Sequence, residues 1–200
     1  MDSDREIPGR TRITVQLRQL RFTAGSLALN LACTVGRRAS TPIERLTSID
    51  RVREWCAGVG LELAAGEATP ELLASLWSLR EAVFEVLRAA VHGGPAAESA
   101  VALVNRAAAV ALPAPVLHVE GLRTEAGALA GAELCSAAAR DLLALLGDPD
   151  RRGRLRECDS GLCRMVYLDT DGGRPRRWCS QRCGNVMKAA RHRARTGSAE

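Results

Sequence analysis

Two cysteine pairs decide the fold of the last 50 residues: Cys158-Asp-Ser-Gly-Leu-Cys163 and Cys179-Ser-Gln-Arg-Cys183. Each pair lies within one tight turn, so both of its thiolates reach the same ion, and two such turns complete a tetrahedral shell. A shell of four thiolates leaves no open position and is typical of a structural zinc site. The sequence therefore predicts one structural Zn²⁺ bound by Cys158, Cys163, Cys179 and Cys183. An iron–sulfur cluster or a pair of disulfides stays open as an alternative.

The residues around these cysteines predict a small metal-dependent domain. They include few apolar side chains, so metal binding would supply most of the folding free energy. Residues 165–168 favour a strand, residues 169–173 contain an Asp-Gly-Gly turn, and residues 174–178 favour a returning strand. After Cys179, Ser180 is a natural N-cap, and helix-compatible residues follow. A knuckle, a β-hairpin and a helix that starts at a second knuckle form a treble-clef finger, which is the fold we expect.

Positive charge is concentrated in the same region. The chain contains 28 Lys and Arg against 23 Asp and Glu, which gives a net charge of +5. Residues 151–200 contain 13 of the basic and 5 of the acidic residues, so this part carries +8 and residues 1–150 carry −3. The turn-rich residues 147–153 coincide with this change of sign. We therefore expect two domains, a body at 1–150 and a basic finger at 151–200.

The predicted C-terminal helix has a basic stripe beside a narrow apolar one. The apolar stripe is formed by Met187, Ala190 and Ala194, and we expect it to pack on the finger. A charged helix face is often only solvated, but this one adjoins a zinc module of a type often used on nucleic acid, and the body has the opposite charge. The candidate DNA contacts are the basic stripe, its polar neighbours and the arginines between the cysteine pairs: Arg174, Arg176, Arg177, Asn185, Lys188, Arg191, His192 and Arg195.

The first 150 residues predict a mainly α-helical body with one or two short strands. Helical periodicity and capping signals mark residues 27–35 after Ser26, 46–59, 70–92 after Thr69, 96–110 and 129–146. Alternating apolar residues predict a short strand over residues 116–122 and a bulged strand over residues 11–22. The body is expected to form a dimer, to bind a small-molecule effector, or both.

Other classes of function find little support in the sequence. No Gly-rich phosphate loop, Ser-His-Asp order or supported pair of carboxylates is present, so we expect that the chain is not an enzyme. His92 and His118 are interpreted as surface residues, and Cys33, Cys56 and Cys135 as buried thiols on apolar stripes. The longest uncharged stretch, residues 22–36, is too short to span a bilayer, and the acidic residues before it argue against a signal peptide. We expect a cytoplasmic protein with reduced cysteines and no membrane contact.

Both parts of the chain resemble a known bacterial family. The finger resembles the CGNR-type zinc finger at Gly153-Arg-Leu-Arg-Glu-Cys158, Tyr167-Leu-Asp169, Arg176-Arg-Trp-Cys-Ser180, Cys183-Gly-Asn185 and Lys188-Ala-Ala-Arg-His192. The body resembles the ABATE domain, whose opening motif is similar to Leu27-Ala-Leu-Asn-Leu-Ala-Cys-Thr-Val35. This resemblance covers nearly the whole chain and implies a stress-induced transcriptional regulator.

The sequence departs from the family pattern at two places. Val186 stands where the family has the arginine that follows Cys-Gly-Asn, which weakens any claim that this position contacts DNA, although the basic stripe does not depend on it. Val186 shares a third side of the predicted helix with Arg182 and Arg193. The usual Asp and Asn of the opening motif are Asn30 and Cys33 here, which puts in doubt any site that the family builds there.

The leading hypothesis is a zinc-dependent transcriptional regulator that binds DNA through its C-terminal helix. Two other classes remain open. The finger could instead be a protein-interaction module whose basic helix grips an acidic surface of a partner. It could also be a redox sensor whose thiolates release zinc on oxidation.

Overall fold

The computed structural model describes residues 14–119, 123–125, 127–170 and 173–196. The helices are α1 (Val15–Arg18), α2 (Leu27–Ala32), α3 (Ile49–Gly58), α4 (Pro70–His92), α5 (Glu98–Ala108), α6 (Gly131–Gly147), α7 (Pro149–Gly153) and α8 (Gln181–Thr196). The strands are β1 (Val35–Gly36), β2 (Ile43–Glu44), β3 (Val116–His118), β4 (Arg123–Glu125), β5 (Leu155–Glu157) and β6 (Val166–Leu168). Within the described residues they form three antiparallel pairs, β1-β2, β3-β4 and β5-β6. The mainly α-helical fold predicted from the sequence is confirmed.

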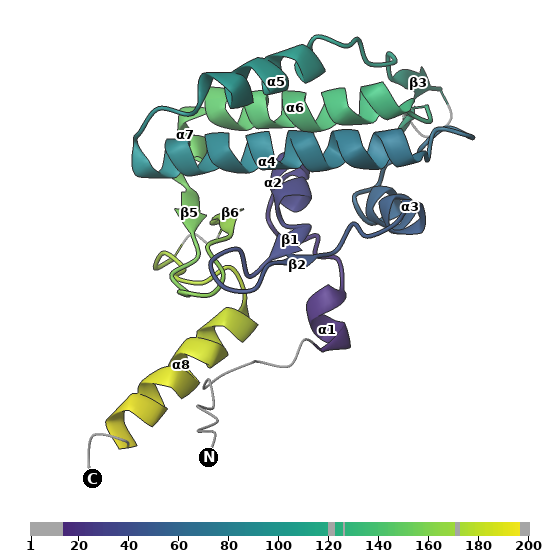
Figure 1. Cartoon of the computed structure of the whole chain (residues 1–200). Coiled ribbons are helices and arrows are strands. Elements are labelled where there is room, and N and C mark those ends of the chain that lie inside the picture. Colours follow the sequence, from purple (N-terminus) through teal and green to yellow (C-terminus); the bar gives the residue numbers. More distant parts are fainter. Residues whose placement is uncertain (1–13, 120–122, 126, 171–172, 197–200) are drawn as a thin grey trace.

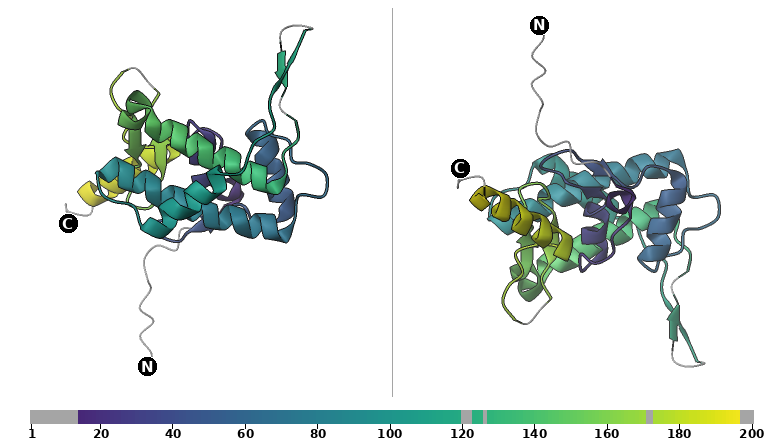
Figure 2. Two further views of the ribbon diagram at one scale, coloured as in Figure 1. Left: turned by 90° about the horizontal axis from the view of Figure 1, so that it is seen from above. Right: turned by 90° about the horizontal axis from the view of Figure 1, so that it is seen from below.

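The helices are arranged in a layer with the smaller elements beneath it (Figure 1). Helices α4, α5 and α6 pack side by side, and α2 packs under α4 and α6. The β5-β6 pair lies under one end of this layer, and α8 extends away from it. The β3-β4 hairpin projects from the opposite end of the body, as Figure 2 shows. The C-terminal region is therefore attached to one end of a helical body, and its helix α8 points away from that body.

The ends of the helices follow the capping signals of the sequence. Ser26 accepts a hydrogen bond from the Leu29 N–H, and Thr69 accepts one from the Leu72 N–H at 3.2 Å. Helix α4 ends at Gly93, whose φ of 71° gives a left-handed cap. The predicted helices at 27–35, 46–59, 70–92, 96–110 and 129–146 are therefore confirmed with small shifts at their ends.

The predicted bulged strand over residues 11–22 is wrong in its described part. Residues Val15–Arg18 form the short helix α1, and residues 11–13 lie outside the described residues. The helix buries only Leu17, while Val15 is 79% exposed, so the apparent alternation does not correspond to one buried face. No strand pairs with this segment among the described residues, and the Leu17 carbonyl instead accepts a hydrogen bond from the Arg45 side chain. The strand predicted at 116–122 is confirmed over β3, and residues 120–122 are not described.

The hydrophobic core is continuous between the helical body and the β5-β6 pair. Its largest buried side chains include Trp55 of α3, Leu76 of α4 and Leu142 of α6, and Tyr167 of β6 belongs to the same cluster. The Leu168 N–H also donates to the carbonyl of Ala24 at 2.9 Å. The finger is thus packed on the body and shares its core.

One glycine allows this close packing and provides a test of it. Gly25 has a φ of +104°, and a Cβ at this position would lie 2.7 Å from the Cβ of Leu168. We expect Gly25→Ala to lower the free energy of unfolding by about 3 kcal/mol, because a strained backbone and an overpacked contact each cost roughly 1–3 kcal/mol. Urea denaturation of the zinc-loaded protein measures this change. Gly60→Ala is the matched control, since its φ is +74° with open space around the Cβ. Equal losses in the two variants would contradict the packing argument.

Candidate metal centre and basic helix

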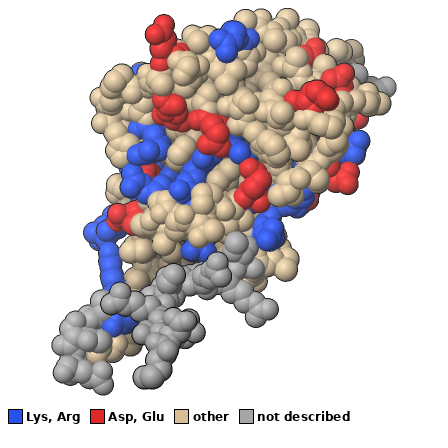
Figure 3. Space-filling view, viewed as in Figure 1, with Lys and Arg blue, Asp and Glu red and all other residues tan. Residues whose placement is uncertain are grey.

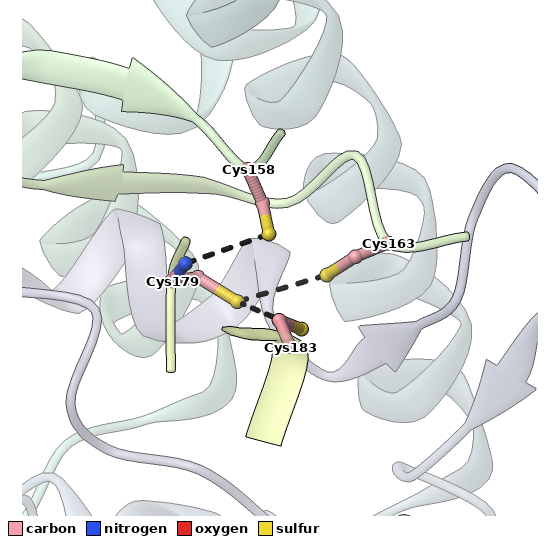
Figure 4. Close-up of side chains that lie close together, drawn as sticks. All are labelled: Cys158, Cys163, Cys179 and Cys183. Carbon is pink, nitrogen blue, oxygen red and sulfur yellow. Dashed lines mark hydrogen bonds between the residues drawn. The ribbon is translucent and has the colours of Figure 1, made fainter. Parts of the chain in front are cut away.

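The four cysteine sulfurs meet at one point between the β5-β6 loop and the start of α8 (Figure 4). All four lie within 4.8 Å of one another, and the Cys179 sulfur is 3.7 Å from those of both Cys163 and Cys183. Zn–S bonds of about 2.3 Å in a tetrahedron separate neighbouring sulfurs by roughly 3.8 Å. The four cysteines are therefore positioned to bind one metal ion, as the spacing in the sequence predicts.

Local hydrogen bonds hold each cysteine pair in its turn. In the first pair, the Cys163 N–H donates to the Ser160 carbonyl at 2.9 Å, and the Cys158 N–H donates to the Met165 carbonyl at 2.8 Å. In the second pair, the Ser180 hydroxyl accepts from the Cys183 N–H at 3.4 Å, which is the predicted N-cap of α8. The Cys179 N–H points at the Cys158 sulfur at 3.5 Å. The first turn of α8 is thus fixed to the cysteine cluster.

The chemistry of this donor set fits a bound cation. Three of the four cysteines are buried, and all four are free. Hydrogen bonds within the cluster raise the pKa of Cys163 and Cys179 and lower that of Cys158 and Cys183. Four ionised thiolates at these distances would also repel one another. The cluster therefore cannot hold four thiolates without a compensating positive charge. A bound dication supplies that charge, and zinc would give the site a closed tetrahedral shell.

Asp169 and Arg176 form the strut that brings the second cysteine pair to the first. The Asp169 carboxylate accepts from the backbone N–H and the Nε of Arg176, both at 3.0 Å, and the Arg176 guanidinium also donates to the Leu168 carbonyl. The Tyr167 hydroxyl donates to the Arg176 carbonyl at 2.5 Å. These contacts fold the chain back from β6, so that Cys179 reaches the cluster.

The strand predicted at 174–178 is therefore wrong, because this segment binds side chains of and near β6 instead of pairing with its backbone. Pro175 lacks an N–H, and the N–H of Arg176 is donated to Asp169, so neither residue can donate a hydrogen bond to a neighbouring strand. The partner of β6 is β5, with Glu157 opposite Val166 and Leu155 opposite Leu168. The hairpin of this finger thus precedes the predicted one and carries the first cysteine pair in its loop.

Glu157, which the sequence reasoning missed, joins the finger to α4. Its carboxylate lies 2.6 Å from His92 Nε2, 3.4 Å from Arg88 Nε, and also pairs with Arg164 of the β5-β6 loop. Burial opposes ionisation of Glu157, but the hydrogen bonds from His92 and Arg164 hold its pKa below the usual value. The cysteine motif is thus anchored to the body one residue before Cys158. No pattern in the sequence marks Glu157, because the three-residue strand β5 that it ends has no hydrophobic alternation.

The candidate DNA contacts fall into two groups. On α8, Asn185, Lys188, Arg191 and His192 are exposed, while the side chain of Arg195 lies outside the described set. Before the second cysteine pair, Arg174 is exposed, Arg176 belongs to the strut, and Arg177 is paired with Asp159. Of the expected apolar stripe, Met187 and Ala190 are half-buried, and the side chain of Ala194 lies outside the described set.

The opening motif of the body forms no site of its own among the described residues. Asn30 accepts from the Ala24 N–H at 3.1 Å, which closes the turn before α2. Cys33 is completely buried, and burial raises its pKa to about 12. Burial also raises the pKa of Cys56 and Cys135 to about 11, so these three thiols are the inert core residues that the sequence predicts.

Comparison with known proteins identifies both parts. A family model named ABATE and described as "Putative stress-induced transcription regulator" matches residues 25–149, well over half of the chain. The chain belongs to the ABATE family. A second family model, the CGNR zinc finger, matches residues 154–196 of this ABATE protein, which include all four clustered cysteines. No curated protein matches the chain. Among the described residues, no helix combines the length and the apolar content that a membrane span requires.

These matches confirm the resemblance stated from the sequence and assign the metal site. The cysteine cluster of the ABATE protein is the metal site of a CGNR zinc finger. The protein is accordingly a zinc-binding member of a family described as transcription regulators.

Proposed function

We propose that this ABATE protein regulates transcription by binding DNA through α8. The observation that carries the proposal is the exposed basic surface of a helix whose first turn is fixed to the metal cluster. Lys188 and Arg191 are exposed on α8, and the helix contains no acidic residue. A helix that projects from a body of net charge −3 offers its positive side to a polyanion.

The residues of α8 and those of the segment before the second cysteine pair have different roles in the proposed DNA binding. Lys188, Arg191 and Arg195 contact phosphates, and Asn185 and His192 lie beside them as polar groups for base edges. Arg174 and Arg177 add contacts from the segment before the second cysteine pair, and Arg176 supports this segment from the side of β6. The β5-β6 loop followed by a helix that begins at the second cysteine pair supports a treble-clef type of finger.

The metal has a structural part in this function, and we propose that the chain is not an enzyme. Four protein thiolates close the shell of a zinc ion, so the site has no position for a reactive water or a substrate. The zinc would hold the start of α8 against the β5-β6 loop. The ABATE domain would then supply dimerisation or the sensing of a signal.

Salt dependence of binding tests the electrostatic part of the proposal. If about five cations meet phosphates, log affinity is expected to fall against log salt with a slope of roughly −4 to −5. Fluorescence anisotropy of a labelled duplex, titrated with the zinc-loaded protein at several NaCl concentrations, measures this slope. A slope near zero, or no binding at 50 mM salt, would contradict the proposal. Duplexes selected from a random pool would then show whether the protein prefers a sequence.

A further inference from the structure

A cavity lies where the ABATE domain meets the start of α8. Its volume is about 340 Å³, which is at the lower end of the range for small-molecule sites. One wall comes from α1 and β1 of the body and the other from α8 and the β5-β6 loop. Apolar side chains form part of the lining, among them Leu17, Leu162 and Val186. Val186 is the residue that replaces the family arginine, and it leaves an apolar surface here.

The rest of the lining is rich in positive charge. Among the described residues, five arginines line the cavity and no Asp or Glu does: Arg21, Arg37, Arg45, Arg182 and Arg193. Figure 3 shows Lys and Arg side chains below the helical layer on the face that it presents, with Asp and Glu side chains beside them. A zinc ion with four thiolates leaves two negative charges nearby, which five guanidinium groups more than offset. The cavity therefore retains a positive potential when the metal is bound.

Arg45 is built into the wall of the cavity. It is only 3% exposed, and its guanidinium donates to the carbonyls of Leu17 at 3.0 Å and Cys33 at 2.8 Å. It lies so close to Gly36 that a Cβ there would sit 2.3 Å from a guanidinium nitrogen. Burial lowers the pKa of Arg45 to about 10, so the side chain stays charged at neutral pH. The fold thus keeps a permanent cation at this place, stabilised by these two carbonyls and by the negative charges of the nearby Cys163 and Glu44.

The other four arginines have capacity to bind a ligand. Within the described residues, Arg21, Arg37, Arg182 and Arg193 make no ion pair, whereas the arginines of α3 and α4 are paired with glutamates or aspartates. Arg37 also has a φ of 54°, a conformation that is uncommon for a residue with a side chain and that occurs often at binding sites. Free guanidinium groups around an apolar floor are the donors that recognise a carboxylate, sulfonate or phosphate head group.

We propose that this cavity binds a small organic anion that has an apolar body. The head group would lie among the arginines, and the body would cover Leu17, Leu162 and Val186. Because one wall belongs to the ABATE domain and the other includes α8, a bound anion would hold α8 in a fixed position relative to the body. The regulatory consequence rests on the proposed function, but the binding of the anion does not. A DNA phosphate fits this cavity less well, because it brings no apolar group for the floor.

Titration with a fluorescent anion tests the proposal without DNA. The probe is 8-anilino-1-naphthalenesulfonate, added to the zinc-loaded full chain in 0.15 M NaCl. We expect one probe per chain, displaced by benzoate and much less by benzyl alcohol. Arg37→Gln and Arg193→Gln should each raise the Kd of the probe about tenfold, since each removes one charge-assisted contact. Arg106→Gln is the matched control, because Arg106 is exposed on α5 and does not line the cavity.

The possible outcomes separate the site from its alternatives. Equal probe affinity in all three variants, or equal displacement by benzyl alcohol, would overturn the proposal. If no probe binds and Arg37→Gln instead weakens binding to duplex DNA, the cavity is part of the DNA surface and the proposal fails. If the probe binds as expected but the protein does not bind DNA, the anion site stands and the proposed function fails.

Discussion

Replacing Cys179 by serine is expected to abolish zinc binding and to unfold the finger. The Cys179 sulfur is the centre of the cluster, 3.7 Å from two of the other sulfurs, and its backbone N–H points at the remaining one. A structural zinc site contributes roughly 10–16 kcal/mol, which is comparable with the whole stability of a domain, about 5–15 kcal/mol. Metal analysis should therefore find less than about 0.1 zinc per chain in Cys179→Ser, and hydrogen exchange should show loss of protection over residues 154–196.

The matched control for this variant is Cys135→Ser. Cys135 is a buried thiol of α6 that lies outside the cluster, so its replacement should cost some stability but leave one zinc per chain. Because the finger shares its core with the body, Cys179→Ser should also lower the melting temperature of the helical part. Unchanged zinc content in Cys179→Ser would contradict the ligand set.

The features that the sequence predicted well are those encoded by neighbouring residues. The spacing of Cys158 and Cys163 requires only one turn, so the motif determines the geometry with little help from the rest of the fold. The same holds for α4, where Thr69, Pro70 and Gly93 mark both ends and the apolar stripe between them is regular. These signals act within a few residues, and tertiary packing did not override them.

The errors arose where pairing depends on distant residues. Strand β5 has only three residues, with Arg156 and Glu157 in two of them, so no hydrophobic pattern marks it. Its pairing with β6 is visible only once the body supplies the core and His92 supplies a partner for Glu157. In the same way, the alternation around Val15 suggested a strand, but no second strand is available there among the described residues.

The candidate anion cavity could not be predicted from the sequence for a related reason. Arg182, Val186 and Arg193 share one side of α8, which the helical wheel shows. Their opposing wall comes from Arg37 and Arg45, more than 100 residues earlier in the chain. A helical wheel identifies the residues that share one face of a helix, but not the residues that lie opposite that face in the fold. The structure thus separates two sides of α8, one that lines the cavity and another that carries the exposed Lys188 and Arg191.

Removing the exposed positive charges of α8 is expected to weaken DNA binding. The variant that tests this is the double substitution Lys188→Gln and Arg191→Gln. Each neutralised phosphate contributes roughly fivefold at 0.15 M salt, so two lost contacts should weaken binding about 30-fold and make the salt slope shallower by about 2. Both side chains are exposed, so the melting temperature should stay unchanged. The control is Arg53→Gln with Arg106→Gln, which removes the same charge from exposed sites on α3 and α5 of the ABATE domain. Equal losses in the two double variants would indicate a general charge effect and would reject α8 as the DNA-binding surface.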